Sequence, residues 1–160
     1  KYYKAFRQYN FRLFIGKFIR NNSLGNTYDF STSSISDYTY SSNLLGRSEN
    51  EGFFSQQYFK NDAGFKSKIN PSFSNDYLAS LNSGITIWKW FEGYFDYGIF
   101  KNMGEKLKTG YDTGLKLNIV ENYLELYFPI LNSEEYILNS NNYTKNIRFT
   151  LVLDPENLTN

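Results

Sequence analysis

The sequence contains no cysteine and no histidine. Without cysteine, the chain has no disulfide framework, no thiol nucleophile and no thiolate ligand for a metal. Without histidine, it has no Ser-His pair, no imidazole general base and none of the usual zinc sites. These two absences argue against catalysis by this segment alone, and we expect neither a cofactor nor a catalytic or metal-binding residue within it.

Helix-forming material is also scarce. Methionine occurs once, and no apolar run approaches the roughly eighteen residues that a membrane-spanning helix needs. Aromatic residues instead make up 20% of the 160 residues, so strand formers dominate. A membrane-spanning strand needs only about 9 to 11 residues.

The charges are balanced and mixed along the chain. Seventeen basic and sixteen acidic residues give a net charge of +1. A protein that binds nucleic acid usually gathers basic residues into a patch or stripe. We therefore expect no nucleic-acid partner.

Apolar and polar residues alternate with a period of two in several segments. In residues 111–119, Tyr111, Thr113, Leu115, Leu117 and Ile119 share one face, and Asp112, Gly114, Lys116 and Asn118 share the other. The same alternation recurs in residues 91–99, 124–128 and 147–153. This pattern predicts an antiparallel β-meander.

The remaining segments complete a prediction of seven or eight strands in a single domain, residues 1–160. Further strands are expected over residues 11–20 and 77–88, with a weak strand at 35–40 and a hairpin made of 53–60 and 64–69. Glu121 and Asn122 predict a tight turn, and residues 21–42 and 131–143 predict polar loops. Because Lys1 is neither an initiator methionine nor the start of a signal peptide, we expect a fragment of a longer chain.

Short turns that alternate with long polar loops are typical of up-and-down outer-membrane barrels. We therefore predict an all-β fold, an antiparallel up-and-down meander that forms all or part of an outer-membrane β-barrel. The alternatives are a soluble β-sandwich or a small barrel that binds a sugar or an apolar ligand.

The barrel interpretation assigns residues to three environments. A polar network inside the barrel would contain Glu92, Asp96, Asp112, Lys116, Glu125 and Arg148. The lipid-facing residues would be Phe91, Phe95, Leu115, Leu117, Ile119, Leu126, Phe149 and Leu151, and an aromatic belt would contain Trp88, Trp90 and Tyr123. The alternatives are a solvated face of an open sheet, ordinary core aromatics and a platform that stacks on sugars.

Two weaker patterns have simpler explanations. Glu92 with Asp96, or Asp112 with Glu125, could supply the two acids of a glycoside hydrolase, but alternate acidic residues on any two strands produce such pairs. Four glycines, Gly93, Gly98, Gly110 and Gly114, are isolated within predicted strands. They indicate places where a curved sheet needs a small residue, and no phosphate-binding loop is present.

Two sets of motifs resemble known families. Residues 111–118, the run Leu-Glu-Leu-Tyr-Phe-Pro at 124–129 and Ile-Arg-Phe-Thr-Leu at 147–151 resemble the closing strands of large outer-membrane barrels. Gly-Arg-Ser-Glu at 46–49, Gly-Phe-Phe-Ser-Gln-Gln at 52–57, Gly-Phe-Lys-Ser at 64–67 and Ile-Trp-Lys-Trp at 87–90 resemble the carboxy-terminal region of gluzincin-type, aminopeptidase N-like metallopeptidases of some Gram-negative bacteria.

The second resemblance implies a zinc peptidase domain upstream of a membrane-associated β-rich region. This sequence departs from the family in lacking every histidine of the zinc motif, so no catalytic residue is carried over. The implied role is an anchor or scaffold in the bacterial outer membrane. Its partners would be membrane lipid and either the remaining strands of its own chain or other envelope proteins, and any zinc would belong to the longer chain.

Overall fold

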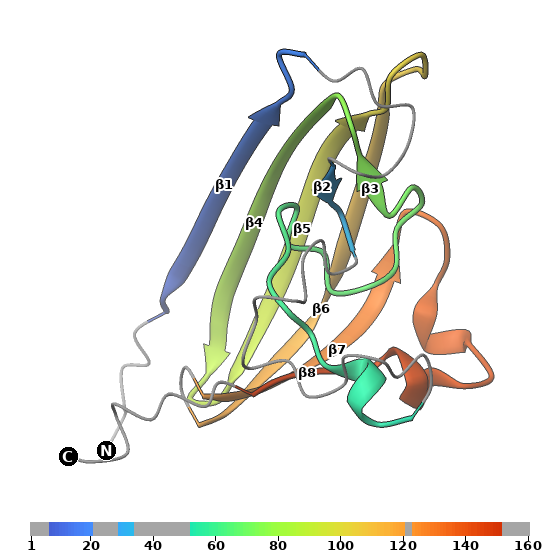
Figure 1. Ribbon diagram of the computed structural model, residues 1–160. Helices are drawn as coiled ribbons and strands as arrows, with labels where there is room; N and C mark the ends of the chain where they lie inside the picture. The colour runs from blue at the N-terminus through green and yellow to red at the C-terminus, as the bar shows by residue number, and fades with distance from the viewer. Residues whose placement is uncertain (1–6, 21–28, 34–51, 121–122, 152–160) are drawn as a thin grey trace.

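The structure, a computed structural model, describes residues 7–20, 29–33, 52–120 and 123–151. Its main feature is a six-stranded antiparallel sheet that curls into a half-barrel (Figure 1). The strands lie in the order β1 (Tyr9–Lys17), β4 (Tyr77–Trp88), β5 (Phe91–Lys101), β6 (Lys108–Val120), β7 (Leu124–Asn132) and β8 (Arg148–Leu151). A separate two-stranded sheet pairs β2 (Phe30–Ser31) with β3 (Phe73–Ser74).

The up-and-down prediction is confirmed, because neighbours in the main sheet follow one another along the chain from β4 to β8. The predicted strands at 77–88 and 91–101 match β4 and β5. The pairing of β5 with β6 sets Asp96 directly opposite Asp112, and Glu92 opposite Lys116. Polar residues from adjacent strands therefore share one face of the sheet.

Several strand boundaries differ from the sequence prediction, among them the start of β6, which is Lys108 rather than residue 111. The first strand ends at Lys17 rather than at residue 20. Strand β7 continues past Phe128 to Asn132 although Pro129 has no N–H to donate. A register shift beside Gly114 accommodates this proline, which lies opposite that glycine. Bulges are among the few places in a sheet that tolerate proline.

The predicted hairpin of 53–60 and 64–69 is wrong. Residues 54–56 form the short 3-10 helix η2 (Phe54–Gln56), and residues 57–72 form irregular chain that leads into β3. We call residues 57–76 the crossing segment, because they run across the concave face of the sheet (Figure 1). Side chains of distant strands bind its backbone groups, which removes the need for a hairpin partner.

Several sequence predictions fall outside the described residues. These are the weak strand at 35–40, the Glu121-Asn122 turn, most of the polar loop at 21–42 and residues 152–153 of the last strand. The second polar loop begins only after β7 ends at Asn132. It contains the 3-10 helix η3 (Ile137–Asn139), is followed by η4 (Tyr143–Asn146), and buries Ile137.

An apolar cluster fills one half of the concave face. Five buried residues form it, two from the strands and three from the crossing segment: Leu78, Phe100, Ala63, Phe65 and Ile69. Two glycines in the wall, Gly98 and Gly110, make room for it. A Cβ atom on Gly98 would lie 2.9 Å from the Phe65 ring, and one on Gly110 would lie 3.0 Å from Ile69.

Helical structure is limited to these short 3-10 turns in the part of the chain that the structure describes. Within it, no helix has the length and apolar character required to cross a membrane.

Candidate functional site

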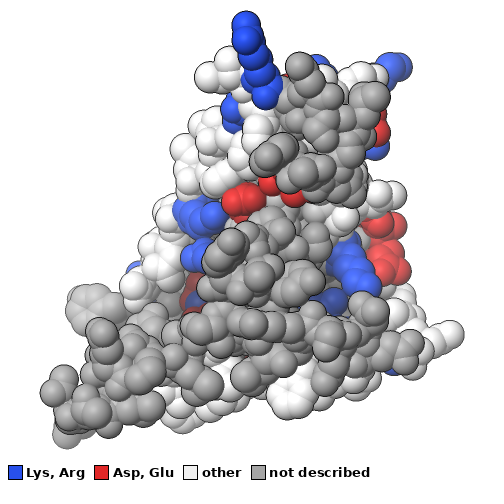
Figure 2. Space-filling model, in the orientation of Figure 1, with Lys and Arg blue, Asp and Glu red and all other residues white. Residues whose placement is uncertain are grey.

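The charged residues of the predicted interior network gather on the concave face. Glu92, Asp96, Asp112, Lys116 and Glu125 come from β5, β6 and β7, and register places them on the same side of the sheet. Figure 2 shows basic and acidic side chains lying side by side on the face that the crossing segment covers. The structure divides these five residues into two clusters.

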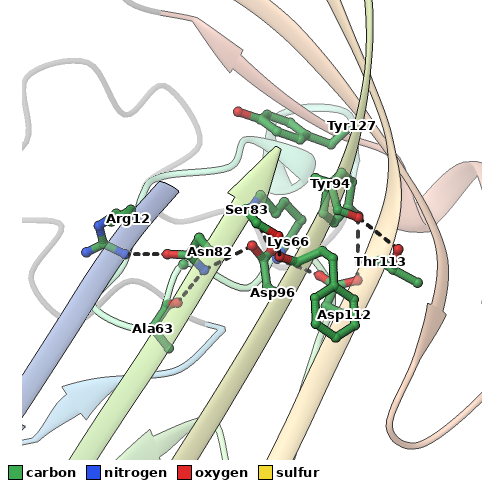
Figure 3. Close-up of polar contacts among 12 residues, drawn as sticks. Arg12, Ala63, Lys66, Asn82, Ser83, Tyr94, Asp96, Asp112, Thr113 and Tyr127 are labelled. Carbon is green, nitrogen blue, oxygen red and sulfur yellow. Dashed lines mark hydrogen bonds and ion pairs between the residues drawn. The ribbon is translucent and has the colours of Figure 1, made fainter. Parts of the chain in front are cut away.

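The first cluster is centred on Asp96, which is fully buried. Its Oδ2 atom lies 2.6 Å from Nζ of Lys66, and its Oδ1 atom accepts a hydrogen bond of 3.0 Å from the Asn82 amide (Figure 3). Lys66 belongs to the crossing segment, so this ion pair joins the segment to the sheet. Breaking one partner of a buried pair is costly because the other charge remains buried.

Asn82 extends this cluster to two further parts of the chain. Its amide nitrogen also donates to the carbonyl oxygen of Ala63 at 2.9 Å, and its Oδ1 atom accepts from Nη1 of Arg12 at 2.9 Å (Figure 3). The side chain therefore connects β1, β4, β5 and the crossing segment.

Asp112 binds the backbone of the crossing segment. Its Oδ2 atom accepts from the N–H groups of Lys66 at 2.8 Å and Ser67 at 2.7 Å. Asn132 adds to this attachment by donating to Oγ of Ser67 and to the carbonyl oxygen of Lys68, both at 3.1 Å. Burial raises the pKa of the fully buried Asp112 carboxyl, and the two backbone N–H donors and the nearby Lys66 ammonium offset part of this rise.

Three tyrosines surround the ammonium group of Lys66. Its Nζ atom lies 4.7 Å from the ring centre of Tyr94, 5.9 Å from that of Tyr127 and 6.0 Å from that of Tyr58. Aromatic faces at such distances attract a cation, and the attraction strengthens when water is excluded. The ion pair and the rings together account for a lysine whose side chain is only 10% exposed.

The second cluster contains Lys116 and two glutamates. Nζ of Lys116 lies 2.9 Å from Glu92 and 3.4 Å from Glu125. Glu125 also accepts hydrogen bonds from the hydroxyl groups of Tyr127 at 2.5 Å and Thr150 at 3.5 Å. The two glutamates thus share one ammonium group.

Arg148 does not join either cluster by a direct bond. Its register opposite Tyr127 places it on the concave side, as predicted. Its Nη1 atom, however, donates to the carbonyl oxygens of Lys145 at 2.8 Å and Ile147 at 3.4 Å. The preceding turn η4 brings these carbonyls within reach, so Arg148 binds its own local backbone.

The residues predicted to face lipid have mixed environments. Phe91, Phe95, Leu115 and Ile119 are 36–49% exposed, whereas Leu117, Leu126 and Leu151 are half-buried. Phe149 is a correction: it is 5% exposed because Phe53 stacks on it with ring centres 4.7 Å apart. Ile119 and Leu151 also border the concave cavity.

In the predicted aromatic belt, Trp88 and Trp90 are exposed and Tyr123 is half-buried.

A cavity of about 1000 Å³ occupies the half of the concave face that the apolar cluster leaves open. All six strands of the main sheet and the crossing segment contribute residues to its wall, among them Glu92, Lys116 and Glu125. Ligand pockets of proteins span roughly 300 to 1000 Å³. The cavity is therefore large enough for a small ligand.

The pairs of acids considered for glycoside hydrolysis are not brought together as isolated pairs. Asp96 and Asp112 hold the crossing segment, and Glu92 and Glu125 share Lys116. Among the described residues, no group of three or more acidic side chains has the arrangement needed to hold a metal ion.

Sequence reasoning missed Lys66, Asn82, Asn132 and Tyr58 as members of the network. Asn82 could have been found, because it lies on the same alternate row of its predicted strand as Ser80 and Gly84. Asn132 was placed in a loop because the strand prediction stopped at the proline. No local pattern marks Lys66 or Tyr58, whose partners lie on distant strands.

No known protein family, curated protein or solved structure matches this chain.

Proposed function

We propose that this chain forms part of an outer-membrane β-barrel and serves to anchor or scaffold a larger envelope protein. The observation that supports the proposal is the contrast between the two faces of the sheet. Leu13, Leu81 and Phe95 point away from the concave face and are 68%, 44% and 47% exposed. The opposite face carries the buried charges, which is the arrangement expected of a barrel with lipid outside and polar groups inside.

The half-barrel requires further strands in this setting. In lipid, every backbone N–H and C=O group needs a partner, so a sheet cannot end at an open edge. Strand β1 pairs only with β4 among the described residues. Additional strands would come from the same protein or from another envelope protein.

The sequence resemblance suggests what such an anchor carries. A gluzincin-type peptidase domain upstream would supply the zinc and the catalytic residues, none of which this segment contains. This segment would then hold the peptidase at the membrane.

A soluble binding module is the second candidate. The apolar cluster around Phe65 and Phe100 favours it, because the cluster is almost fully buried between the sheet and the crossing segment. A sheet with such a core on one face is also stable in water.

An arginine substitution on each face of β1 tests the first proposal. In phospholipid vesicles, Leu13→Arg should lower the free energy of unfolding by about 2 to 4 kcal/mol if the residue lies near the bilayer midplane. The control Asn10→Arg, on the concave side of the same strand, should cost less than about 1 kcal/mol. Urea titration of the refolded protein measures both values.

Two results would count against the membrane anchor. One is an equal and small cost of both substitutions in vesicles. The other is a wild-type protein that refolds to a monodisperse monomer without detergent or lipid, as a soluble module should.

A further inference from the structure

The wall of the concave cavity carries an excess of positive charge. Among the residues that the structure describes, five cationic side chains and two carboxylates line it: the cations are Arg12, Lys60, Lys66, Lys89 and Lys116, and the carboxylates are Glu92 and Glu125. Two of the cations are neutralised by ion pairs. Lys66 pairs with Asp96 behind the wall, and Lys116 is shared by both glutamates.

Arg12, Lys60 and Lys89 remain without a carboxylate partner among the described residues. The ammonium group of Lys89 instead lies 5.0 Å from the ring centre of Trp90. The guanidinium of Arg12 donates to the neutral amide of Asn82 at 2.9 Å. Lys60 forms no ion pair with any residue that the structure describes. Arg12 and Lys60 both line the cavity, and the pKa of the Lys60 amine is lowered by partial burial and then by the positive charge of Arg12. An anion between them would relieve this repulsion.

Neutral polar groups occupy other parts of the wall. Asn118 lines the cavity on the β6 side, and its Oδ1 atom is buried with no hydrogen-bond donor among the described residues. A buried acceptor without a donor is costly, so a hydroxyl or N–H group of a ligand would satisfy it. The rings of Tyr94, Tyr127 and Trp90 also line the cavity. Aromatic rings combined with amide groups suit the mixed apolar and hydroxylated faces of a sugar.

We propose that this cavity binds a free, hydroxylated anion of sugar size, either a sugar acid or a sugar phosphate, with its charged group between Arg12 and Lys60. The hydroxyl groups of the ligand would reach toward Asn118 and the aromatic side of the wall. The site lies on the concave face, away from the exposed apolar row of Leu13, Leu81 and Phe95. The proposal therefore holds whether the convex face meets lipid or water.

Calorimetry with four probes tests the proposal: glucuronate, glucose 6-phosphate, inorganic phosphate and uncharged glucose. The refolded chain should bind glucuronate or glucose 6-phosphate at least tenfold more tightly than glucose. Phosphate alone should bind more weakly than the sugar that carries it, because it lacks the hydroxyl groups. Binding of phosphate equal to that of glucose 6-phosphate would overturn the sugar part of the proposal and leave an anion site.

Charge-removing variants locate the binding site. Lys60→Gln should weaken binding of the charged sugar by about tenfold, which corresponds to about 1.4 kcal/mol. Lys60 is only partly covered and forms no ion pair among the described residues, so a folding defect in this variant is unexpected. The control Lys106→Gln removes the same charge from an exposed turn outside the cavity and should leave the affinity unchanged.

Three results would overturn the site. They are equal affinities of the wild type and Lys60→Gln, an equal loss in Lys106→Gln, and the absence of binding for every probe. Arg12→Gln provides a second measurement. Circular dichroism first shows whether the Arg12→Gln variant is folded. The folded variant should also bind the charged sugar more weakly than the wild type. An unchanged affinity would exclude Arg12 from the binding site.

Discussion

The two halves of the concave face have the same strand pattern but different contents. In one half, Leu78 and Phe100 pack against Phe65 and Ile69 in a buried cluster. In the other half, Glu92 and Lys116 border a cavity of about 1000 Å³. Both halves belong to the same strands, so alternation alone does not decide what fills the interior. The difference comes from the crossing segment, which brings the apolar residues Ala63, Phe65 and Ile69 to the first half and a mixture of aromatic and polar residues, among them Tyr58, Phe59 and Lys60, to the wall of the cavity.

The layer of Asp96, Asp112 and Lys66 lies between the two halves. On β5 the concave row runs from Glu92 through Tyr94, Asp96 and Gly98 to Phe100, so the ionic layer separates the open half from the filled half. Asp112 and Asn132 fix the backbone of the crossing segment at this level. The ionic layer therefore determines where the apolar residues of the segment are placed.

The largest expected effect tests the filled half directly. Phe100→Ala should lower the free energy of unfolding by about 3 to 5 kcal/mol, because it leaves a hole among fully buried neighbours. Trp90→Ala removes a ring of similar size from the open half, where Trp90 is 55% exposed, and should cost less than about 1 kcal/mol. Urea titration of both variants under identical conditions measures the two costs. Equal costs would contradict the distinction between the two halves.

The next effect concerns the attachment of the crossing segment. Asp112→Ala should cost roughly 2 to 4 kcal/mol, since it leaves two backbone N–H groups without an acceptor. Trypsin should also cleave faster after Lys66 and Lys68. The control Asp76→Ala breaks a more exposed ion pair with Lys101 and should cost less than about 1 kcal/mol. Unchanged cleavage in Asp112→Ala would show that other contacts hold the segment.

The smallest of the three effects uses two glycines of one strand. Gly98→Ala should cost about 1 to 3 kcal/mol, because its Cβ would lie 2.9 Å from the buried Phe65 ring. Gly93→Ala, on the opposite face, would meet Ile87 only at an ordinary contact distance of 3.4 Å and should change stability by less than about 0.5 kcal/mol. Thermal unfolding measures the midpoints of the two variants. Equal midpoints would contradict tight packing over Gly98.

The sheet was largely predictable because its information is local. Alternation within 77–88, 91–101 and 111–119 assigned both the strands and the faces of Asp96, Asp112 and Lys116. The ends of strands were harder to predict where neighbouring residues accommodate a residue that is unfavourable in a strand. Pro129 is the example, because the strand on which it lies continues beyond it owing to a bulge beside Gly114.

The crossing segment could not be predicted from local pattern. Its backbone is held by Asp112 and Asn132, which lie about 45 and 65 residues further along the chain. Phe53–Lys60 and Gly64–Ile69 have enough apolar residues to suggest strands, but they do not pair with each other as a hairpin. The N–H of Tyr58 donates to the carbonyl oxygen of Phe149, and the N–H groups of Lys66 and Ser67 donate to the Asp112 carboxylate. The lysine at the centre of the ionic layer was missed for the same reason.

The bridge between Gln57 and Phe149 has a consequence for the order of folding. Gln57 lies beside β8 in parallel, and the N–H of Tyr58 donates to the carbonyl oxygen of Phe149 at 2.6 Å. During synthesis, residues 57 and 58 must wait until about ninety more residues have been made before this partner exists. Contacts so distant in sequence form slowly, because closing the intervening loop costs entropy before the contact is gained. The ring of Phe53, which stacks on Phe149, would lack its partner for the same time. The attachment of residues 53–58 to β8 is therefore expected to be a late step in folding.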